Sequence, residues 1–222
     1  MKIANDFYGF DNLNKGLSDT AFNLFGLGDT KRWTEWMKNK RPQESKVQRG
    51  ITGTLSWEIE DGTLTISGTG EMPNYSGTYC PWYSEKFSIK DAVICNGITC
   101  IGEFAFYECS RLTWVSIPDS VTSIGNIPFA GCARLTEINV DENNANYASN
   151  DGVLFNKAKT TLLKYHVGKT GVYAIPYSVT CIGKGAFSFC KELTTVVIPD
   201  SVTNIEDEAF ANCQGLTTLC SH

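Results

Sequence analysis

The sequence predicts a mainly β repeat protein, a right-handed solenoid of short stacked units, and two observations carry this prediction. The segment Leu112–Gly125 reads LTWVSIPDSVTSIG, and Leu193–Ile205 repeats it as LTTVVIPDSVTNI. Successive cysteines of the repeat lie 23 residues apart, as Cys109 and Cys132 do. A unit this short cannot bury its own apolar face, so neighbouring units must stack and share one continuous core.

Two further copies and two aligned columns fix the register of the units. Residues 92–106 and 173–187 repeat the same pattern. The interval of 58 residues from Cys132 to Cys190 equals two periods plus an insertion of 12 residues. We interpret the cysteine column as buried free thiols, because a small apolar side chain suits an inward position of the stack. Each cysteine follows an aromatic residue by three positions: the pairs are Phe106 and Cys109, Phe129 and Cys132, Phe187 and Cys190, and Phe210 and Cys213.

Each unit divides into two extended pieces and a turn. Val115 and Ile117 fit a short strand, Val121 and Ile124 fit a second extended piece, and the Ala-Phe pair fits a tight helical or 3₁₀ turn. These units resemble the BspA-like branch of the leucine-rich repeats, whose units read roughly Leu-x-x-Ile-x-Ile-Pro-x-Ser-Val-Thr-x-Ile-Gly-x-x-Ala-Phe-x-x-Cys. The resemblance implies a right-handed leucine-rich-repeat solenoid. It also implies a non-enzymatic protein-binding module, like the adhesin-type surface proteins of host-associated bacteria and trichomonad protists.

Residues 1–46 lack the repeat pattern, and we expect a helical N-terminal extension there. A helix over residues 30–39 would carry Trp33, Trp36 and Met37 on one face. This stripe could dock on the first layer of the solenoid, as part of the cap that repeat arrays need. It could instead bind a partner or a membrane surface.

Residues 47–88 are expected to form a β-hairpin cap of the repeat array. Apolar and polar residues alternate over residues 55–59 and 64–66, and Asp61-Gly62 between them favours a tight turn. The run Gly62–Gly70 and the later Pro-Trp-Tyr are similar to the N-terminal cap of BspA-like proteins. The resemblance therefore extends upstream of the repeats.

Residues 89–222 hold the repeats, interrupted by an insertion at about 141–168. Asp151-Gly152 before an alternating apolar stretch indicates a turn into a strand, so we expect an extra hairpin there. The acidic and amide side chains of residues 141–144 lack the spacing and the closing Glu of an EF-hand loop, so we interpret them as a solvated turn. From Leu216 the chain opens another repeat, whose exposed strand edge could mediate oligomerisation.

Charge is unevenly distributed along the chain. Residues 1–50 hold nine Lys or Arg against six Asp or Glu, whereas the remainder holds ten against eighteen, a formal charge of −8. An acidic solenoid argues against a nucleic-acid partner, because phosphate binding needs a basic track. No apolar run reaches 18 residues, so no membrane insertion is expected. The expected partner is therefore a protein.

No pattern in the sequence predicts an enzyme, a cofactor or a metal site. There is no CxxC pair, and His166 and His222 are the only histidines. Nucleophilic catalysis needs a base beside the nucleophile and a third orienting group, and the only internal histidine, His166, lies in the insertion. His166 beside a cysteine is the one catalytic arrangement that the sequence leaves open. The run Gly68-Thr69-Gly70 lacks the GK[ST] ending of a phosphate loop and is interpreted as a turn. We therefore expect no catalytic, cofactor-binding or metal-binding residues.

The solenoid offers a binding surface instead. If Val115 and Ile117 point inward, Trp114 and Ser116 point outward. An outward Trp is a frequent hot-spot residue at interfaces, although the insertion hairpin could cover it. The repeat period carries the outward positions into other units. The candidate partner-binding residues are Asp91, Trp114, Ser116, Glu137, Asn139 and Thr195, together with Trp33, Trp36 and Met37 of the extension.

Two cellular locations remain open from the sequence. The family resemblance favours a cell-surface or secreted protein. The first residues hold no export signal, and nine cysteines cannot pair completely and suit a reducing compartment. Either the protein acts in the cytoplasm, or the sequence begins after a leader. The alternative function is accordingly an intracellular interaction or inhibitory protein whose aromatic N-terminal helices contact the partner.

Overall fold

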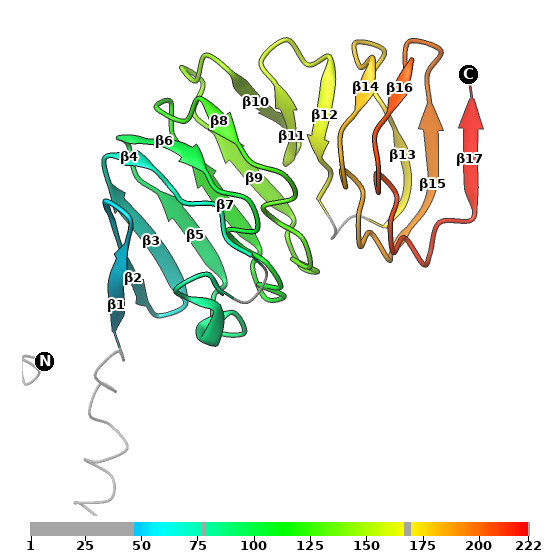
Figure 1. Ribbon diagram of the computed structural model, residues 1–222. Helices are drawn as coiled ribbons and strands as arrows, with labels where there is room; N and C mark the ends of the chain where they lie inside the picture. The colour runs from blue at the N-terminus through cyan, green and yellow to red at the C-terminus, as the bar shows by residue number, and fades with distance from the viewer. Residues whose placement is uncertain (1–46, 77–78, 167–169, 222) are drawn as a thin grey trace, which may run out of the picture. The chain divides into compact units, whose positions relative to one another are not determined.

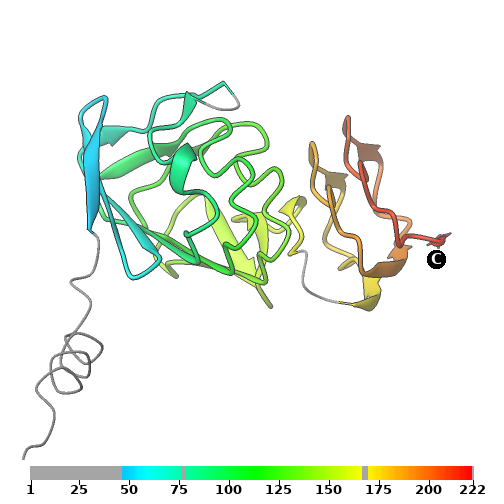
Figure 2. The same ribbon diagram turned by 90° about the horizontal axis from the view of Figure 1, so that it is seen from below.

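A computed structural model of the chain describes residues 47–76, 79–166 and 170–221 (Figure 1). All of these residues belong to one compact unit. Strands dominate this unit, and a 3₁₀ turn, η3 (Tyr83–Glu85), lies in the cap. The predicted mainly β solenoid is confirmed. Figure 2 shows the units from below, with the corresponding segments of successive units lying side by side.

The strands form four sheets. A six-stranded sheet has the order β1-β2-β3-β5-β7-β9, and a five-stranded sheet the order β10-β11-β12-β14-β16. Two three-stranded sheets have the orders β4-β6-β8 and β13-β15-β17. The bounds are β1 Gln48–Thr52, β2 Leu55–Glu60, β3 Thr63–Gly68, β4 Gly70–Glu71, β5 Asp91–Ile94, β6 Ile98–Ile101, β7 Trp114–Ile117, β8 Ser123–Ile124, β9 Glu137–Val140, β10 Tyr147–Asn150, β11 Val153–Asn156, β12 Thr161–Lys164, β13 Gly171–Ala174, β14 Cys181–Ile182, β15 Leu193–Ile198, β16 Asn204–Ile205 and β17 Thr218–Ser221.

The parallel pairing of β5, β7 and β9 follows directly from the repeat. Each unit places its first strand beside the equivalent strand of the next, with Ala92 opposite Val115 and Val115 opposite Ile138. These three side chains are fully buried. Successive strand residues point to opposite faces, so the residues beside them point outward.

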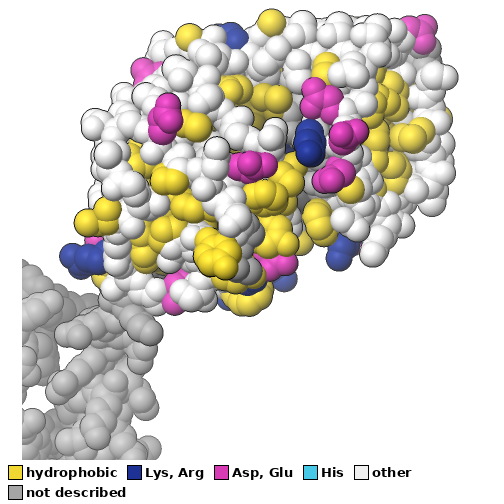
Figure 3. Space-filling model, in the orientation of Figure 1, with side chains coloured by type: hydrophobic (Ala, Val, Ile, Leu, Met, Phe, Trp, Pro, Cys, Tyr) yellow, Lys and Arg dark blue, Asp and Glu magenta, His cyan; other side chains and the backbone are white. Residues whose placement is uncertain are grey.

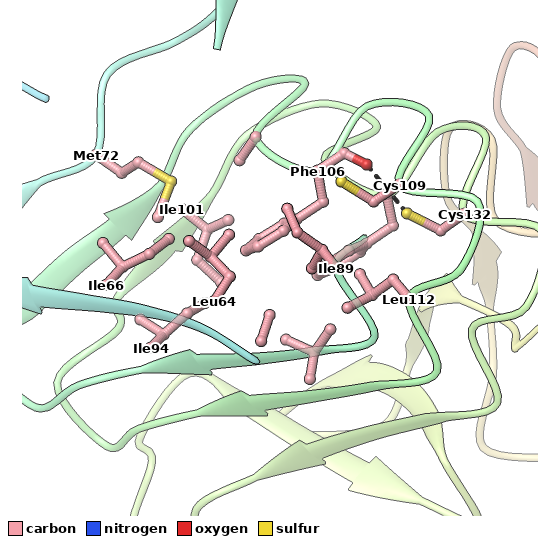
Figure 4. Close-up of a cluster of buried hydrophobic side chains, with 14 of the residues drawn as sticks. Leu64, Ile66, Met72, Ile89, Ile94, Ile101, Phe106, Cys109, Leu112 and Cys132 are labelled. Atoms are coloured by element: carbon pink, nitrogen blue, oxygen red, sulfur yellow. Dashed lines mark hydrogen bonds between the residues drawn. The ribbon is translucent and has the colours of Figure 1, made fainter. Parts of the chain in front are cut away.

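Aromatic rings and thiols fill the space between the turns. Figure 4 shows Phe106, Cys109 and Cys132 inside the core, where the Cys132 thiol donates a hydrogen bond to the Phe106 carbonyl at 3.1 Å. Cys109, Cys132 and Cys190 are buried and Cys213 is partly buried, and all four are free thiols. The predicted column of buried free thiols is therefore confirmed for three layers. In the last layer the Cys213 thiol is only partly buried.

Trp82 closes the core at the cap. Its side chain is completely buried, its indole N–H donates to the Ala105 carbonyl at 2.8 Å, and its ring lies 6.3 Å from that of Phe106. Trp57 and Tyr75 meet the edge of the Trp82 ring, at 6.1 and 5.7 Å. The Trp thus extends the aromatic column of the repeats by one layer into the cap.

The predicted cap hairpin is confirmed, and it carries one strand that the sequence analysis did not predict. β2 and β3 pair antiparallel, and the turn residues Asp61 and Gly62 both have positive φ, 49° and 89°. β1 adds to β2 from the other side. The sequence QRGIT of β1 does not alternate apolar and polar residues, because Ile51 is its one aliphatic residue. The Ile51 side chain is also 77% exposed.

The insertion forms the expected hairpin and a third strand. β10 and β11 pair antiparallel, β12 returns beside β11, and β12 then pairs in parallel with β14. The insertion is therefore part of the stack and connects the repeats on its two sides. The buried core divides here into two clusters, one ending at Leu154 and the other beginning at Val153.

The interpretation of residues 141–144 as a solvated turn is wrong for Asn144. This side chain is fully buried, and its amide group donates to the carbonyls of Pro118 and Val121 at 2.8 and 2.9 Å. Its carbonyl oxygen accepts from the amides of Asn146 and Tyr147 at 2.9 and 2.8 Å. Burial of this polar residue is tolerated because four hydrogen bonds satisfy it.

Candidate binding surface

The outward face of the six-stranded sheet brings several predicted residues together. Strand register places Asp91 beside Trp114 and Trp114 beside Glu137, so these residues form one continuous row. We call Asp91, Trp114 and Glu137 the acidic row. Ser116 and Asn139 lie opposite each other in the next row of the same face.

Local hydrogen bonds orient the two carboxylates beside Trp114. The Thr113 hydroxyl donates to Asp91 Oδ1 at 3.2 Å, and the Asn139 amide donates to Glu137 Oε1 at 2.8 Å. Glu137 is exposed, whereas Asp91 and Trp114 are partly buried. The row therefore presents an aromatic side chain between two carboxylates in a fixed order.

The insertion hairpin covers the edge of β9 and lies one strand beyond Trp114. The Ile138 amide donates to the Gly152 carbonyl at 3.2 Å, and the Val140 amide donates to the Ser149 hydroxyl at 3.1 Å. Trp114 remains partly exposed. An open polar groove of about 580 Å³ lies between β9 and the hairpin, lined by Thr136, Glu137, Asn139, Ser149, Asn150, Asp151 and Gly152. This groove continues the acidic row at its Glu137 end.

Thr195 belongs to a different sheet. It lies on β15, between Val172 of β13 and Thr218 of β17, in the three-stranded sheet that follows the insertion. The repeat period correctly makes Thr195 the equivalent of Trp114 in a later unit. The two residues do not share a row, because the insertion separates their sheets. Trp33, Trp36 and Met37 lie outside the described residues.

A second surface feature carries aromatic side chains that the sequence analysis did not propose. Tyr79 and Phe87 are 79% and 61% exposed. The Lys86 ammonium lies 3.8 Å from the centre of the Tyr83 ring and forms an ion pair with Glu108. Figure 3 shows hydrophobic side chains gathered over the region of η3. The Pro-Trp-Tyr segment is the sequence feature that marks this aromatic region. The repeat pattern does not predict which side chains of the region point outward, because the segment does not follow the repeat.

The described residues bring together no cluster of metal ligands. Nowhere in this part of the chain do three or more His, Cys, Asp or Glu side chains gather as metal ligands would. His166 is buried, with its ring stacked on Tyr165 at 4.6 Å. Burial raises the pKa of the Cys80 thiol to about 11, and it also raises the pKa of the Cys109 thiol. Such thiols are poor nucleophiles, because the thiolate is the reactive form.

Among the same residues, no helix is long and apolar enough to cross a bilayer.

The repeated strand, turn and core positions define a leucine-rich-repeat solenoid. Residues 79–217 match the family model described as BspA type leucine rich repeat region, in six copies. This match spans more than half of the sequence, so the chain belongs to the BspA-type leucine-rich repeat family. The resemblance drawn from the sequence is confirmed.

Several solved structures of bacterial proteins are similar to the chain. The chain is similar to a leucine-rich repeat protein from Eubacterium ventriosum, with 25% identity, coverage of 79% of this chain and 72% of that one, and a TM-score of 0.37. It is similar to the pneumococcal vaccine antigen PcpA, with 17% identity, coverage of 78% and 70%, and a TM-score of 0.50. A leucine rich cell surface protein from Faecalibacterium prausnitzii has 19% identity, coverage of 78% and 76%, and a TM-score of 0.42. No curated protein matches the sequence.

Proposed function

We propose that the chain is a non-enzymatic binding module that holds a polypeptide partner against the acidic row. The observation that carries this proposal is the position of Trp114, partly exposed between the carboxylates of Asp91 and Glu137. A Trp that is partly exposed on the free protein gains stabilisation when a partner buries it, and such residues dominate many interfaces. Two flanking carboxylates favour a partner with Lys or Arg side chains on either side of an apolar contact.

The charge of the chain supports a basic partner. Beyond residue 50 the chain carries a formal charge of −8. A charge of this size speeds encounter with cationic partners and disfavours nucleic acid. By family resemblance, the proposed location is the cell surface or the secreted fraction, where the partner would be an extracellular protein.

Selection of peptides on the immobilised full chain tests the proposed surface. A display library of extended peptides should yield binders enriched in Lys and Arg. Their binding should be lost in Trp114→Ala and weakened in Glu137→Gln. High salt should weaken binding to the wild type more than binding to Glu137→Gln, because salt screens the carboxylate that the variant lacks. Val172→Ala is the matched control, because Val172 is 68% exposed on the equivalent face of another sheet. Binders that keep their affinity for Trp114→Ala would overturn the proposal.

The cysteine state favours a second candidate, an intracellular interaction or inhibitory protein. All nine cysteines are free thiols, and a secreted protein rarely carries so many. Labelling of intact cells with a membrane-impermeant amine reagent separates the two candidates. Labelled protein places the chain at the surface, whereas labelling only after lysis supports the intracellular function.

A further inference from the structure

One boundary between successive turns lacks a hydrogen bond that the other boundaries have. The Phe106 amide donates to the Pro128 carbonyl at 2.9 Å, and the Phe187 amide donates to the Ala209 carbonyl at 2.7 Å. The Tyr165 amide, at the end of the insertion, donates in the same way to Ala186 at 2.8 Å. The equivalent amide of Phe129 has no acceptor among the described residues.

A cavity of about 140 Å³ lies at this boundary. The turn that contains Phe129 lines it, together with the turn from Gly183 to Ser188. Ile127 of the first turn, Leu154 and Leu163 supply aliphatic side chains to the wall. The cavity therefore has a wall of apolar and polar residues, and Phe129, whose amide lacks an acceptor, is one of them.

A buried ammonium group belongs to the same wall. Lys164 is only 6% exposed, and its Nζ donates to the Ser188 carbonyl and hydroxyl, both at 3.2 Å, and to the Gly185 carbonyl at 3.4 Å. Lys164, Gly185 and Ser188 all line the cavity. All of these acceptors are neutral, and within the described residues no carboxylate lies in ion-pair range of Lys164.

A buried cation without a counter-ion is costly. Burial lowers the pKa of the Lys164 ammonium, and the charges of the Cys190, Cys132 and Cys213 thiolates would oppose this shift. An anion placed in the cavity would relieve this cost and would accept the free Phe129 N–H. Lys184 and Glu206 also line the cavity, but both are exposed and carry opposite charges. The charge deep in the cavity is therefore that of Lys164.

We propose that this cavity binds a small organic monocarboxylate with a short hydrocarbon tail. The carboxylate takes the place of the Gly185 carbonyl, at 3.4 Å the longest of the three contacts, as an acceptor of the Lys164 ammonium. It also accepts a hydrogen bond from the Phe129 amide, and the tail packs against Ile127, Leu154 and Leu163. This site is independent of the acidic row, which lies on the outward face of the six-stranded sheet.

Titration of the full chain with sodium butyrate tests the site. The probe should raise the melting temperature in a saturable manner and shift the amide resonance of Phe129. Sodium chloride at equal ionic strength and neutral butyramide should do neither. Lys164→Met should weaken butyrate binding by about tenfold or more, as expected for the loss of a charge-assisted hydrogen bond. Lys184→Met is the matched control and should retain most of the affinity, because this lysine is exposed.

Two results would overturn the proposal. One is a butyrate response no larger than that of chloride or butyramide, which would indicate a cavity that holds water only. The other is an equal loss in Lys164→Met and Lys184→Met, which would indicate general surface charge. Should Lys164→Met fail to fold, the comparison of butyrate with butyramide on the wild-type chain still decides. Trp114→Ala should leave the butyrate response unchanged, so failure of the acidic row is a separate result.

Discussion

The ring of Phe106 stacks on the ring of Phe129 in the next turn, with centroids 5.4 Å apart and planes 14° from parallel. Phe187 and Phe210 repeat this arrangement after the insertion, at 4.9 Å and 10°. The spacing of the sequence repeat is therefore reproduced as a spacing between rings. Because each ring packs on the ring of a neighbouring turn, loss of one ring weakens two layers at once.

Phe106→Ala should destabilise the protein by about 3–5 kcal/mol, because Phe106 is fully buried between Trp82 and Phe129. Urea denaturation followed by circular dichroism measures this change. Phe87→Ala is the control, because Phe87 is 61% exposed and its loss leaves no cavity. A loss of less than about 1 kcal/mol for Phe106→Ala would show that the ring does not fill the core.

Asn144→Ala should cost about 2–4 kcal/mol, because it removes the partners of two backbone carbonyls and two backbone amides. Asn143→Ala is the matched control. Asn143 is exposed, and its side chain donates only to Asp141. Chemical denaturation of the two variants provides the comparison. Equal stability of both would mean that water replaces the Asn144 side chain.

Repetition explains how much of the fold could be predicted. The aromatic and cysteine columns, the outward positions of Trp114 and Ser116, and the hairpin turn at Asp61-Gly62 each depend on a local pattern that the structure reproduces. A period constrains every unit at once, so a few residues establish the register of many. The fold class and the position of the acidic row could be predicted for this reason.

Features that arise where the repeat is interrupted could not be predicted. The polar run around Asn144 predicts an exposed turn. The burial of Asn144 depends on four hydrogen-bond partners, which are distant carbonyls and local amides that only the folded insertion brings together. β1 is an edge strand with little buried surface, so its sequence lacks a hydrophobic period. The cavity beside Lys164 lies at the boundary where the insertion does not reproduce one turn-to-turn hydrogen bond. A sequence pattern does not report such a missing contact.

Gly102→Ala should be much more damaging than Gly183→Ala, although the two glycines occupy equivalent repeat positions. A Cβ on Gly102 would fall on the Pro73 carbonyl oxygen, whereas a Cβ on Gly183 would lie 3.1 Å from the Leu162 carbonyl oxygen. We expect the free energy of unfolding to fall by at least about 1–3 kcal/mol in Gly102→Ala and by under about 1 kcal/mol in Gly183→Ala. Melting temperatures of the two variants give the order. The reverse order would mean that the cap yields more readily than the later repeats.

Cys132 and Lys164 should change the pH dependence of stability in opposite directions. Burial raises the pKa of the Cys132 thiol from 9.0 to about 12. Above pH 9 the unfolded chain therefore releases this proton first, and the stabilisation present below pH 9 is lost as the pH rises toward 12. Burial lowers the pKa of Lys164 from its ordinary 10.5. Just below pH 10.5 the unfolded chain holds the additional proton, so this group makes stability rise with pH.

Denaturation of the wild type and the two variants between about pH 8 and pH 10.5 separates these effects. Each group can change the slope of the unfolding free energy by up to about 1.4 kcal/mol per pH unit. Cys132→Ala should flatten the alkaline decline of the wild type, and Lys164→Met should steepen it. Lys164 lowers the pKa of the Cys132, Cys190 and Cys213 thiols, so Lys164→Met also raises these pKa values and steepens the alkaline decline in the same direction. If both variants shift the slope in the same direction, one of the two side chains is not desolvated in the folded protein.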